Sequence, residues 1–135
     1  MEKIVSRAII LGEKGSILLG KRANGSLAGR WALIGEKPNQ GETEEQAVVR
    51  ETGEEIGARL LKPIFWKEVL QEAITPGDFL RESYFFGIIA TNIEELNLNL
   101  EEISEVGYVS RSNLENFDIV PIHKKIIEEL FSQKG

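Results

Sequence analysis

The sequence predicts a single α/β or α+β domain, and three observations carry this prediction. At 135 residues the chain can build one hydrophobic core but not two. Strand-like runs are interleaved with two helical patterns along its length. The first two strand-like runs, residues 4–11 and 17–21, flank a turn at residues 13–15 and predict an antiparallel hairpin. Such a hairpin argues against a doubly wound parallel sheet.

The remaining elements follow from local patterns. Residues 31–34 form a short apolar run, preceded by a loop over 23–30 that carries Asn24-Gly25 and Gly29. Later strands are expected over residues 59–70, 81–91 and 105–110, and a second helix over 121–131. These elements complete a layered arrangement of strands and helices.

The clearest helix is expected over residues 44–56. Thr43 is a good N-cap residue, and Gln46 three positions later completes a capping box. Gly57 is placed to end the helix in a left-handed conformation. Four residues at helical spacing supply a face to bury, namely Val48, Val49, Thr52 and Ile56.

Composition excludes several classes of function. Hydrophobic residues make up 41% of the chain and charged residues 28%, as in ordinary folded proteins. A net charge of -6 disfavours broad binding to nucleic acid. The absence of cysteine excludes disulfides and thiolate chemistry and fits a reducing cytoplasm. With neither a signal-peptide core nor an apolar span of about 20 residues, the chain is expected to be soluble and unprocessed.

Three carboxylates on the predicted helix suggest chemistry. Glu51, Glu54 and Glu55 stand at positions i, i+3 and i+4, and we expect them to project from one face. Such like charges repel unless a cation joins them, and hard divalent ions prefer oxygen ligands. A solvated acidic surface is the alternative interpretation. Gly53 favours a functional site over a solvated surface. Glycine costs a helix about 1 kcal/mol relative to alanine, so helix propensity alone does not explain its presence.

The stretch that contains these residues resembles the Nudix box. Glu42 is followed by seven residues, then Arg50-Glu51, Glu54-Glu55 and Gly57, at the spacing of that motif. The matching region covers about residues 35–58. The similarity extends to Leu18-Leu19-Gly20-Lys21-Arg22, to Trp31-Ala32-Leu33 and to the run at 105–110. Within the family, the pattern is most similar to MutT-type nucleoside triphosphate pyrophosphohydrolases.

The resemblance implies a fold and an activity. The fold would be an α/β/α sandwich in which a mixed β-sheet lies between helices, formed by one domain over residues 1–135. The activity would be hydrolysis of a diphosphate linkage in a nucleoside triphosphate or another nucleoside diphosphate derivative. Mg²⁺, or Mn²⁺ in its place, would assist attack by water. A homodimer is compatible with this resemblance.

The resemblance also implies roles for single residues. Arg50 would pair with Glu42 and orient the neighbouring carboxylates. A carboxylate of this helix, or one from a later loop, would deprotonate the attacking water. Glu102 is the candidate for the later acid, with Glu101 and Glu105 as rivals and an ordinary acidic loop as the alternative. The expected metal ligands are the Gly35 carbonyl, Glu51, Glu54, Glu55 and Glu102; the expected catalytic residues are Arg50, Glu51, Glu54, Glu55 and Glu102.

Four positions are expected to bind substrate. Arg22 and Arg81 correspond to phosphate-binding positions of MutT-like members, with a surface role as the alternative. Leu33 and His123 are the other two, and His123 stands where relatives use an asparagine to read the base. A structural or exposed role for this single histidine is the alternative.

Glu36 breaks the motif, because the box should open with glycine at this position. If its backbone needs a positive φ, the Cβ of Glu36 would strain the loop. Alternatively, Glu36 could add a carboxylate to the metal site or obstruct the substrate. Glu36 is also the best support for a non-catalytic domain that senses nucleotides. Other substrates left open are nucleotide sugars, dinucleoside polyphosphates and, least favoured, capped RNA.

Overall fold

The computed structural model describes residues 2–72 and 77–133. A four-stranded mixed sheet forms its centre, with the strand order β4-β1-β6-β5. β1 runs parallel to β6, while the β1–β4 and β5–β6 pairs are antiparallel. The bounds of these strands are Glu2–Ile10 for β1, Ile34–Glu36 for β4, Leu61–Glu72 for β5 and Phe79–Ile88 for β6.

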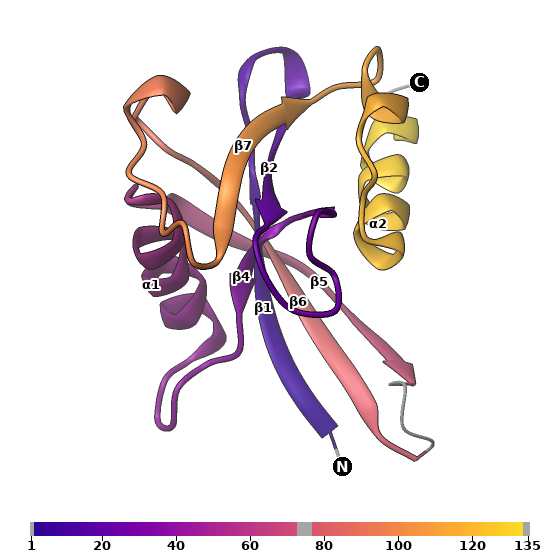
Figure 1. Ribbon diagram of the computed structural model, residues 1–135. Helices are drawn as coiled ribbons and strands as arrows, with labels where there is room; N and C mark the ends of the chain where they lie inside the picture. The colour runs from indigo at the N-terminus through magenta and orange to yellow at the C-terminus, as the bar shows by residue number, and fades with distance from the viewer. Residues whose placement is uncertain (1, 73–76, 134–135) are drawn as a thin grey trace.

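A second sheet of three antiparallel strands has the order β3-β2-β7. Its strands are β2 (Ile17–Arg22), β3 (Trp31–Ala32) and β7 (Ile103–Val109). Helix α1 (Glu44–Ile56) and helix α2 (Pro121–Ser132) lie on opposite sides of the strands, as Figure 1 shows. The predicted fold class, strands in a mixed arrangement between helices, is therefore confirmed.

The predicted N-terminal hairpin is wrong. β1 and β2 belong to different sheets, and the ends of the two segments are joined by an isolated antiparallel bridge between Leu11 and Ile17 and by the adjacent bond from the Gly12 amide to the Ser16 carbonyl. β6 pairs with β1 along its whole length, and β4 pairs with it on the other side at Ser6–Ala8, so β2 pairs instead with β3 and β7. The expected single strand at 31–34 is likewise divided between the two sheets, with Leu33 between β3 and β4.

Two hydrophobic cores flank the strands, and consecutive strand residues alternate between them. On β1, Ala8 and Ile10 belong to the core beneath α1, whereas Ile9 belongs to the core beneath α2. On β6, Phe85 belongs to the core beneath α1 and Tyr84 to the core beneath α2. This is the two-residue period of a strand buried on both faces. The shared strands therefore connect the two helical layers.

Helix α1 has the predicted bounds and caps. The Thr43 side chain accepts from the Gln46 amide at 3.0 Å, and Gln46 Oε1 accepts from the Thr43 amide at 2.9 Å. Gly57 has φ 70°, the predicted left-handed conformation. Val48, Thr52 and Ile56 are buried as expected, while Val49 is half-buried; the same side of the helix also buries Ala47, Glu51 and Glu55.

Helix α2 begins with Pro121, a residue suited to the first turn because it needs no amide partner there. It buries His123, Ile126 and Ile127 against the strands. Neither α1 nor α2 is long and apolar enough to cross a membrane, and these are the α-helices of the described residues. Short 3₁₀ helices at Glu13–Gly15, Ile93–Glu95 and Leu114–Asn116 complete the connections.

β5 is an edge strand of the four-stranded sheet, and its ladder with β6 is irregular. The register shifts between Leu61 and Ile64 and again between Phe65 and Lys67. Pro63 lies within the strand, and the side chains of Ile64 and Phe65 are exposed. The outer edge of β5 is thus neither flat nor regular.

Candidate metal and substrate site

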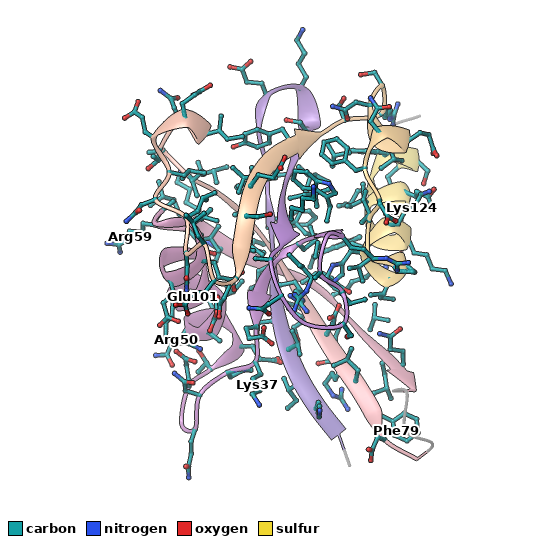
Figure 2. The ribbon with its side chains drawn as sticks, viewed as in Figure 1. Lys37, Arg50, Arg59, Phe79, Glu101 and Lys124 are labelled. Carbon is teal, nitrogen blue, oxygen red and sulfur yellow. The ribbon has the colours of Figure 1, made fainter. Side chains whose placement is uncertain are left out.

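Three carboxylates converge where α1 faces the loop before β7. Glu51, Glu55 and Glu102 each place an oxygen so that all three oxygens lie within 4.8 Å of one another. Glu51 and Glu55 come from one side of α1, one turn apart, and Glu102 comes from a loop about 50 residues later. Figure 2 shows this loop, labelled at Glu101, against the part of α1 that carries Arg50. The structure therefore brings together three of the predicted site residues.

Backbone hydrogen bonds hold the loop that carries Glu102 against the end of α1. The Asn99 amide donates to the Glu55 carbonyl at 2.9 Å, and the Asn97 amide donates to the Ile56 carbonyl at 3.1 Å. The last carbonyls of a helix lack partners within the helix, and this loop supplies them. The Asn99 carbonyl in turn accepts from the Glu102 amide at 2.9 Å. Sequence analysis missed Asn99, because its main-chain bonds leave no signal in residue type.

The loop after β2 is attached to the same segment. The Ala23 amide donates to the Glu102 carbonyl at 2.9 Å, and the Asn24 side-chain amide donates to the Glu101 carbonyl. Just before this loop, the β2–β7 register shifts between Lys21 and Arg22. Such a bulge re-aims the side chain beside it, here that of Arg22.

The carboxylate cluster has the electrostatics of a cation site. Glu51 and Glu55 are only 6% and 5% exposed. Burial, reinforced by the neighbouring Glu51, raises the pKa of Glu55 well above its ordinary value, although Arg7 opposes the shift. Partial burial and the charge of Glu51 also raise the pKa of Glu102. Oxygen donors this crowded and this deeply buried fit a hard divalent cation.

Glu54 lies apart from the three clustered oxygens. Its side chain is 57% exposed, and Oε1 accepts from Arg50 Nη1 at 3.0 Å. The expectation that all three helix carboxylates project from one face holds only for Glu51 and Glu55. On a helix, positions i+3 and i+4 lie on opposite sides of position i, about 100° apart, so one can be buried while the other faces solvent. The role of Glu54 as a metal ligand stays a prediction.

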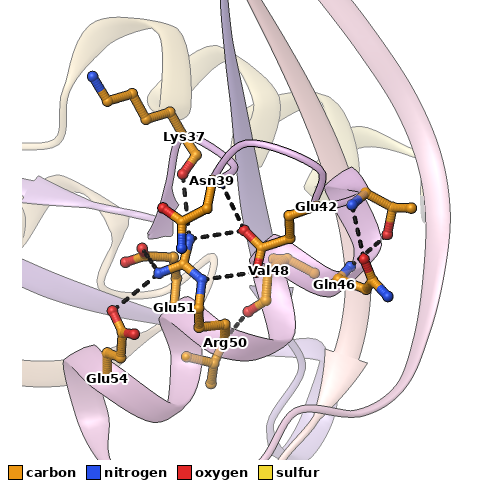
Figure 3. A network of polar contacts seen from close by, with 10 residues as sticks. Lys37, Asn39, Glu42, Gln46, Val48, Arg50, Glu51 and Glu54 are labelled. Carbon is orange, nitrogen blue, oxygen red and sulfur yellow. Dashed lines mark hydrogen bonds and ion pairs between the residues drawn. The ribbon is translucent and has the colours of Figure 1, made fainter.

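Arg50 makes the expected pair with Glu42. Its Nε donates to Glu42 Oε2 at 2.8 Å and its Nη2 donates to Glu42 Oε1 at 3.0 Å, a two-bond arrangement visible in Figure 3. This pair, with help from the Asn39 amide, lowers the pKa of Glu42. Arg50 Nη1 also donates to Glu51. Arg50 therefore ties the loop before α1 to the carboxylates of the helix.

Gly35 is held in a conformation that only glycine accepts. Its φ is 138°, and a Cβ built there would lie 2.0 Å from the Ser6 carbonyl oxygen. Its carbonyl, expected as a metal ligand, accepts a hydrogen bond of 2.7 Å from Arg7 Nη1. The strand is thus packed directly against β1 at the point where the loop to α1 departs.

The strain considered for Glu36 is absent. Among the described non-glycine residues, a positive φ occurs at Lys14 and Lys62, and Glu36 has none. Its side chain is exposed, and its charge contributes to the raised pKa of Glu102 after burial and Glu51. Glu36 therefore adds negative charge near the cluster without distorting the loop.

Leu33 and His123 lie in the interior. His123 is 2% exposed, its Nδ1 accepts from the Leu33 amide at 3.2 Å, and its Nε2 lies 3.1 Å from Glu82 Oε1. Because Nδ1 accepts, Nε2 carries the proton and donates to Glu82. Burial lowers the pKa of His123, in keeping with a neutral ring. This placement favours the structural interpretation of the histidine.

Glu82 is the centre of this buried network. Its oxygens accept from His123, from the Tyr84 hydroxyl at 2.5 Å and from Arg7 Nε at 3.3 Å. Burial alone would raise its pKa, but these partners lower the pKa to about 2. Sequence analysis missed Arg7 and Glu82. The available signal was a charged residue inside each of two apolar strand patterns, where a partner across the sheet is required.

The two predicted phosphate-binding arginines differ in their surroundings. The Nε atom of Arg22 is buried, and no hydrogen-bond partner for it exists in the part of the chain that the structure describes. The charge of Arg22 acts on Glu102, whose pKa it lowers. Arg81, on β6, forms an ion pair with Glu68 on the neighbouring strand. Of these two arginines, Arg22 is therefore the one that the structure connects with the carboxylate cluster.

Comparison with known proteins assigns this arrangement to a family. Residues 1–130 match the sequence model of the NUDIX domain family. The chain is 29% identical to the nucleoside triphosphatase NudI of Enterobacter sp. (strain 638), over 93% of this chain and 92% of NudI.

Two solved structures show the same fold. The MutT protein of Methanosarcina mazei Go1 has 28% identity and a TM-score of 0.78, with 98% of this chain and 94% of that chain covered. The NUDIX domain of Shewanella oneidensis NrtR, complexed with ADP ribose, has a TM-score of 0.81 at 15% identity, with 100% and 90% covered. The second likeness concerns the fold alone.

Proposed function

This chain belongs to the NUDIX family, and from that premise we propose that it cleaves a diphosphate linkage in a nucleoside triphosphate with the help of a divalent metal ion. It is a pyrophosphohydrolase of a family that in general hydrolyses nucleoside diphosphate derivatives. The observation that carries the metal-dependent mechanism is the meeting of Glu51, Glu55 and Glu102 within 4.8 Å. Carboxylates at this distance, two of them buried, are stabilised in their charged form by a shared cation.

The proposed ion is Mg²⁺, with Mn²⁺ as a substitute. Glu51, Glu55 and Glu102 would hold it, and Glu54 and the Gly35 carbonyl are proposed as further ligands. When bound, such an ion neutralises the diphosphate oxygens and lowers the pKa of the attacking water. Arg50 keeps the carboxylates of α1 oriented through its bonds to Glu42, Glu51 and Glu54.

Glu102 is the proposed acceptor of the proton from the attacking water. It is exposed, whereas Glu51 and Glu55 are buried. It is therefore the member of the cluster that a solvent water can approach most readily. Glu54 is the alternative proton acceptor, because it is the exposed carboxylate beside Glu51 and Glu55 on α1. Its carboxylate, however, accepts a hydrogen bond from Arg50.

Arg22 is the proposed phosphate-binding residue. A buried guanidinium Nε without a partner is costly unless a ligand completes it, and an anionic phosphate oxygen is a suitable acceptor. Arg81 is retained as a second phosphate-binding residue. Leu33 and His123 are both buried. We propose that they affect substrate binding indirectly, by supporting the shape of the substrate site.

The relatives rank the substrates. A nucleoside triphosphate comes first, because NudI of Enterobacter is named a nucleoside triphosphatase. The other diphosphate derivatives follow without an order among them, since the likeness to the Shewanella domain concerns the fold alone. Cleavage would yield a monophosphate and the remainder of the substrate, which is pyrophosphate if the substrate is a triphosphate. The clustered carboxylates disfavour the alternative of a non-catalytic sensor, which has less need of them.

The test is a panel of nucleoside triphosphates, ADP-ribose, nucleotide sugars and dinucleoside polyphosphates, incubated with Mg²⁺, Mn²⁺ or EDTA and resolved by chromatography. We expect hydrolysis at a diphosphate bond that EDTA abolishes. Glu55→Gln and Glu102→Gln should each lower kcat at least 100-fold, since they remove a ligand or the base. Glu45→Gln is the matched control, because Glu45 is an exposed glutamate on the same helix.

Two outcomes would overturn the proposal. Equal activity with EDTA would exclude the metal-dependent mechanism. Tight nucleotide binding by calorimetry, with no product from any member of the panel, would establish the sensor instead.

We propose one domain over residues 1–135 and a cytoplasmic location, both from sequence. Size-exclusion chromatography with light scattering tests the homodimer directly.

A further inference from the structure

Arg7 connects the buried Glu82 network to the backbone that leads into α1. Its Nε donates to Glu82 Oε2 at 3.3 Å, and its Nη1 donates to the Gly35 carbonyl at 2.7 Å and to the Leu33 carbonyl at 3.4 Å. The side chain is 11% exposed, and that of Glu82 is 3% exposed. A guanidinium presents several donors in a fixed plane, so one residue can hold all three acceptors at once.

The partners of Glu82 prevent Arg7 from turning away. Glu82 is held by the Tyr84 hydroxyl from β6 and by His123 from α2. His123 also binds the Leu33 amide. Thus α2, β6 and β1 together fix both the amide and the carbonyl of Leu33 and the carbonyl of Gly35. In Figure 1, β1 is flanked by β4 and β6 and lies between the two helices, in keeping with this bridging position.

Gly35 is the last buried residue before the loop to α1. The far end of that loop is anchored by the Arg50–Glu42 pair. Arg7 is also close enough to Glu55 for its charge to act on that carboxylate. One side chain therefore contacts the Gly35 carbonyl and influences the buried acid of the cluster.

We propose that Arg7 is a positioning residue, which fixes the direction of the Gly35 carbonyl relative to Glu51 and Glu55 and thereby sets the affinity of the metal site. This inference rests on the proposed metal-dependent function. It assigns Arg7 no contact with substrate. Two other roles predict different behaviour: Arg7 could only offset the charge of Glu55, or it could only stabilise the fold.

The test compares Arg7→Lys and Arg7→Met with the parent protein. Lysine keeps the positive charge but has a single ammonium group, which cannot hold Glu82 and two carbonyls in one plane. Methionine keeps the length and loses charge and donors. Mn²⁺ affinity is measured by electron paramagnetic resonance of free Mn²⁺, on protein shown to be folded by circular dichroism. kcat and KM are measured separately.

We expect both variants to bind Mn²⁺ at least tenfold more weakly, the size of effect that partners of metal ligands commonly show. kcat should fall with little change in KM, because substrate contacts are intact. Glu82→Gln leaves Arg7 in place but weakens its anchor, and should give a smaller loss in the same direction. Lys124→Met is the control for loss of one cation, since Lys124 lies on α2 and pairs with Glu115.

Each other outcome overturns the proposal. Parent-like Mn²⁺ affinity in Arg7→Lys, with tighter binding in Arg7→Met, would show a charge effect alone. Unchanged affinity in both, with a lower melting temperature, would show a structural role alone. If Arg7→Met does not fold, the Mn²⁺ affinities of Arg7→Lys and Glu82→Gln still distinguish a positioning role from the other two roles. The Mn²⁺ affinities are informative even if the parent hydrolyses nothing on the panel, so failure of this inference and failure of the proposed function can be distinguished.

Discussion

The backbone amide of Asn99 donates a 2.9 Å hydrogen bond to the carbonyl of Glu55. Through this bond, the helix turn that carries one buried carboxylate also fixes the loop that carries another, Glu102. The backbone positions of the two acids are therefore fixed relative to one another by main-chain hydrogen bonds. Changes that move this loop should disturb the cluster even when no acid is altered.

Gly57→Ala is such a change. A Cβ at this position would lie 2.8 Å from both the Cβ and the carbonyl oxygen of Asn97, and φ is 70°. We expect the loop to shift, the protein to lose about 1–2 kcal/mol of stability, and Mn²⁺ binding to weaken. Urea denaturation and Mn²⁺ titration measure the two effects. Weaker stability with parent-like Mn²⁺ affinity would show that the loop does not set the cluster.

Gly53→Ala should have the opposite effect on stability. Gly53 lies within α1, and a Cβ there would approach nothing closer than the Ala58 carbonyl oxygen, at 3.9 Å. Alanine should stabilise the helix by about 0.5–1 kcal/mol, because glycine is a poor helix former. The melting temperature checks this. A destabilised variant would mean that the helix needs glycine here for a reason absent from the static structure.

Stability should fall in acid because of Glu82 and His123. Burial lowers the pKa of His123 below its ordinary 6.5. Burial alone would raise the pKa of Glu82, but its partners lower it from 4.5 to about 2. Below these ordinary values the unfolded chain binds more protons than the folded one, so their contribution is present at neutral pH and lost as pH falls. Urea denaturation between pH 3 and 7 measures the slope.

Glu82→Gln tests the same network at fixed pH. Removing the charge that three donors surround should cost about 3–5 kcal/mol at pH 7 and flatten the dependence on acid. Glu94→Gln, at an exposed glutamate, is the control. An acid slope that is equally steep in Glu82→Gln would mean that other groups cause the acid sensitivity.

Divalent metal should stabilise the folded chain. A ligand that binds only the folded state adds about 2.7 kcal/mol at 100 times its Kd. We expect Mg²⁺ to raise the melting temperature of the parent and to have little effect on Glu55→Gln. Ca²⁺ and NaCl at equal ionic strength separate a specific site from general screening. Equal shifts in parent and variant would place the ion elsewhere.

Glu36→Gly restores the family's usual residue, but it should not stabilise the protein. Glu36 ends β4 and has no positive φ, so no strain is released. Glycine should instead cost about 0.5–1 kcal/mol through backbone entropy. A clear gain in stability would show that the loop is strained by Glu36 after all.

What the sequence predicted well depends on local chemistry. Thr43, Gln46 and Gly57 define the ends of α1 by contacts within a few residues, and these caps were predicted with their mechanism. The spacing of Glu51 and Glu55 follows from helix geometry in the same way. The arrangement of Arg50 and Glu42 came from the family resemblance, and the structure shows the pair.

What could not be predicted depends on distant pairing. A two-residue period shows that residues 4–11 form a strand, but not that its neighbours are β4 and β6 rather than β2. Arg7 and Glu82 are 75 positions apart, so neither reveals the other. Glu54 was grouped with Glu51 and Glu55 because spacing alone does not show which side of the helix is buried.

The irregular edge of β5 bears on how copies of this chain can associate. Proline offers no amide to a neighbouring strand, and two breaks in register remove the even repeat that an added strand would need. We therefore expect little strand-by-strand aggregation at this edge, although Ile64 and Phe65 are exposed there. A homodimer is therefore not expected to form by extending the sheet through this edge of β5.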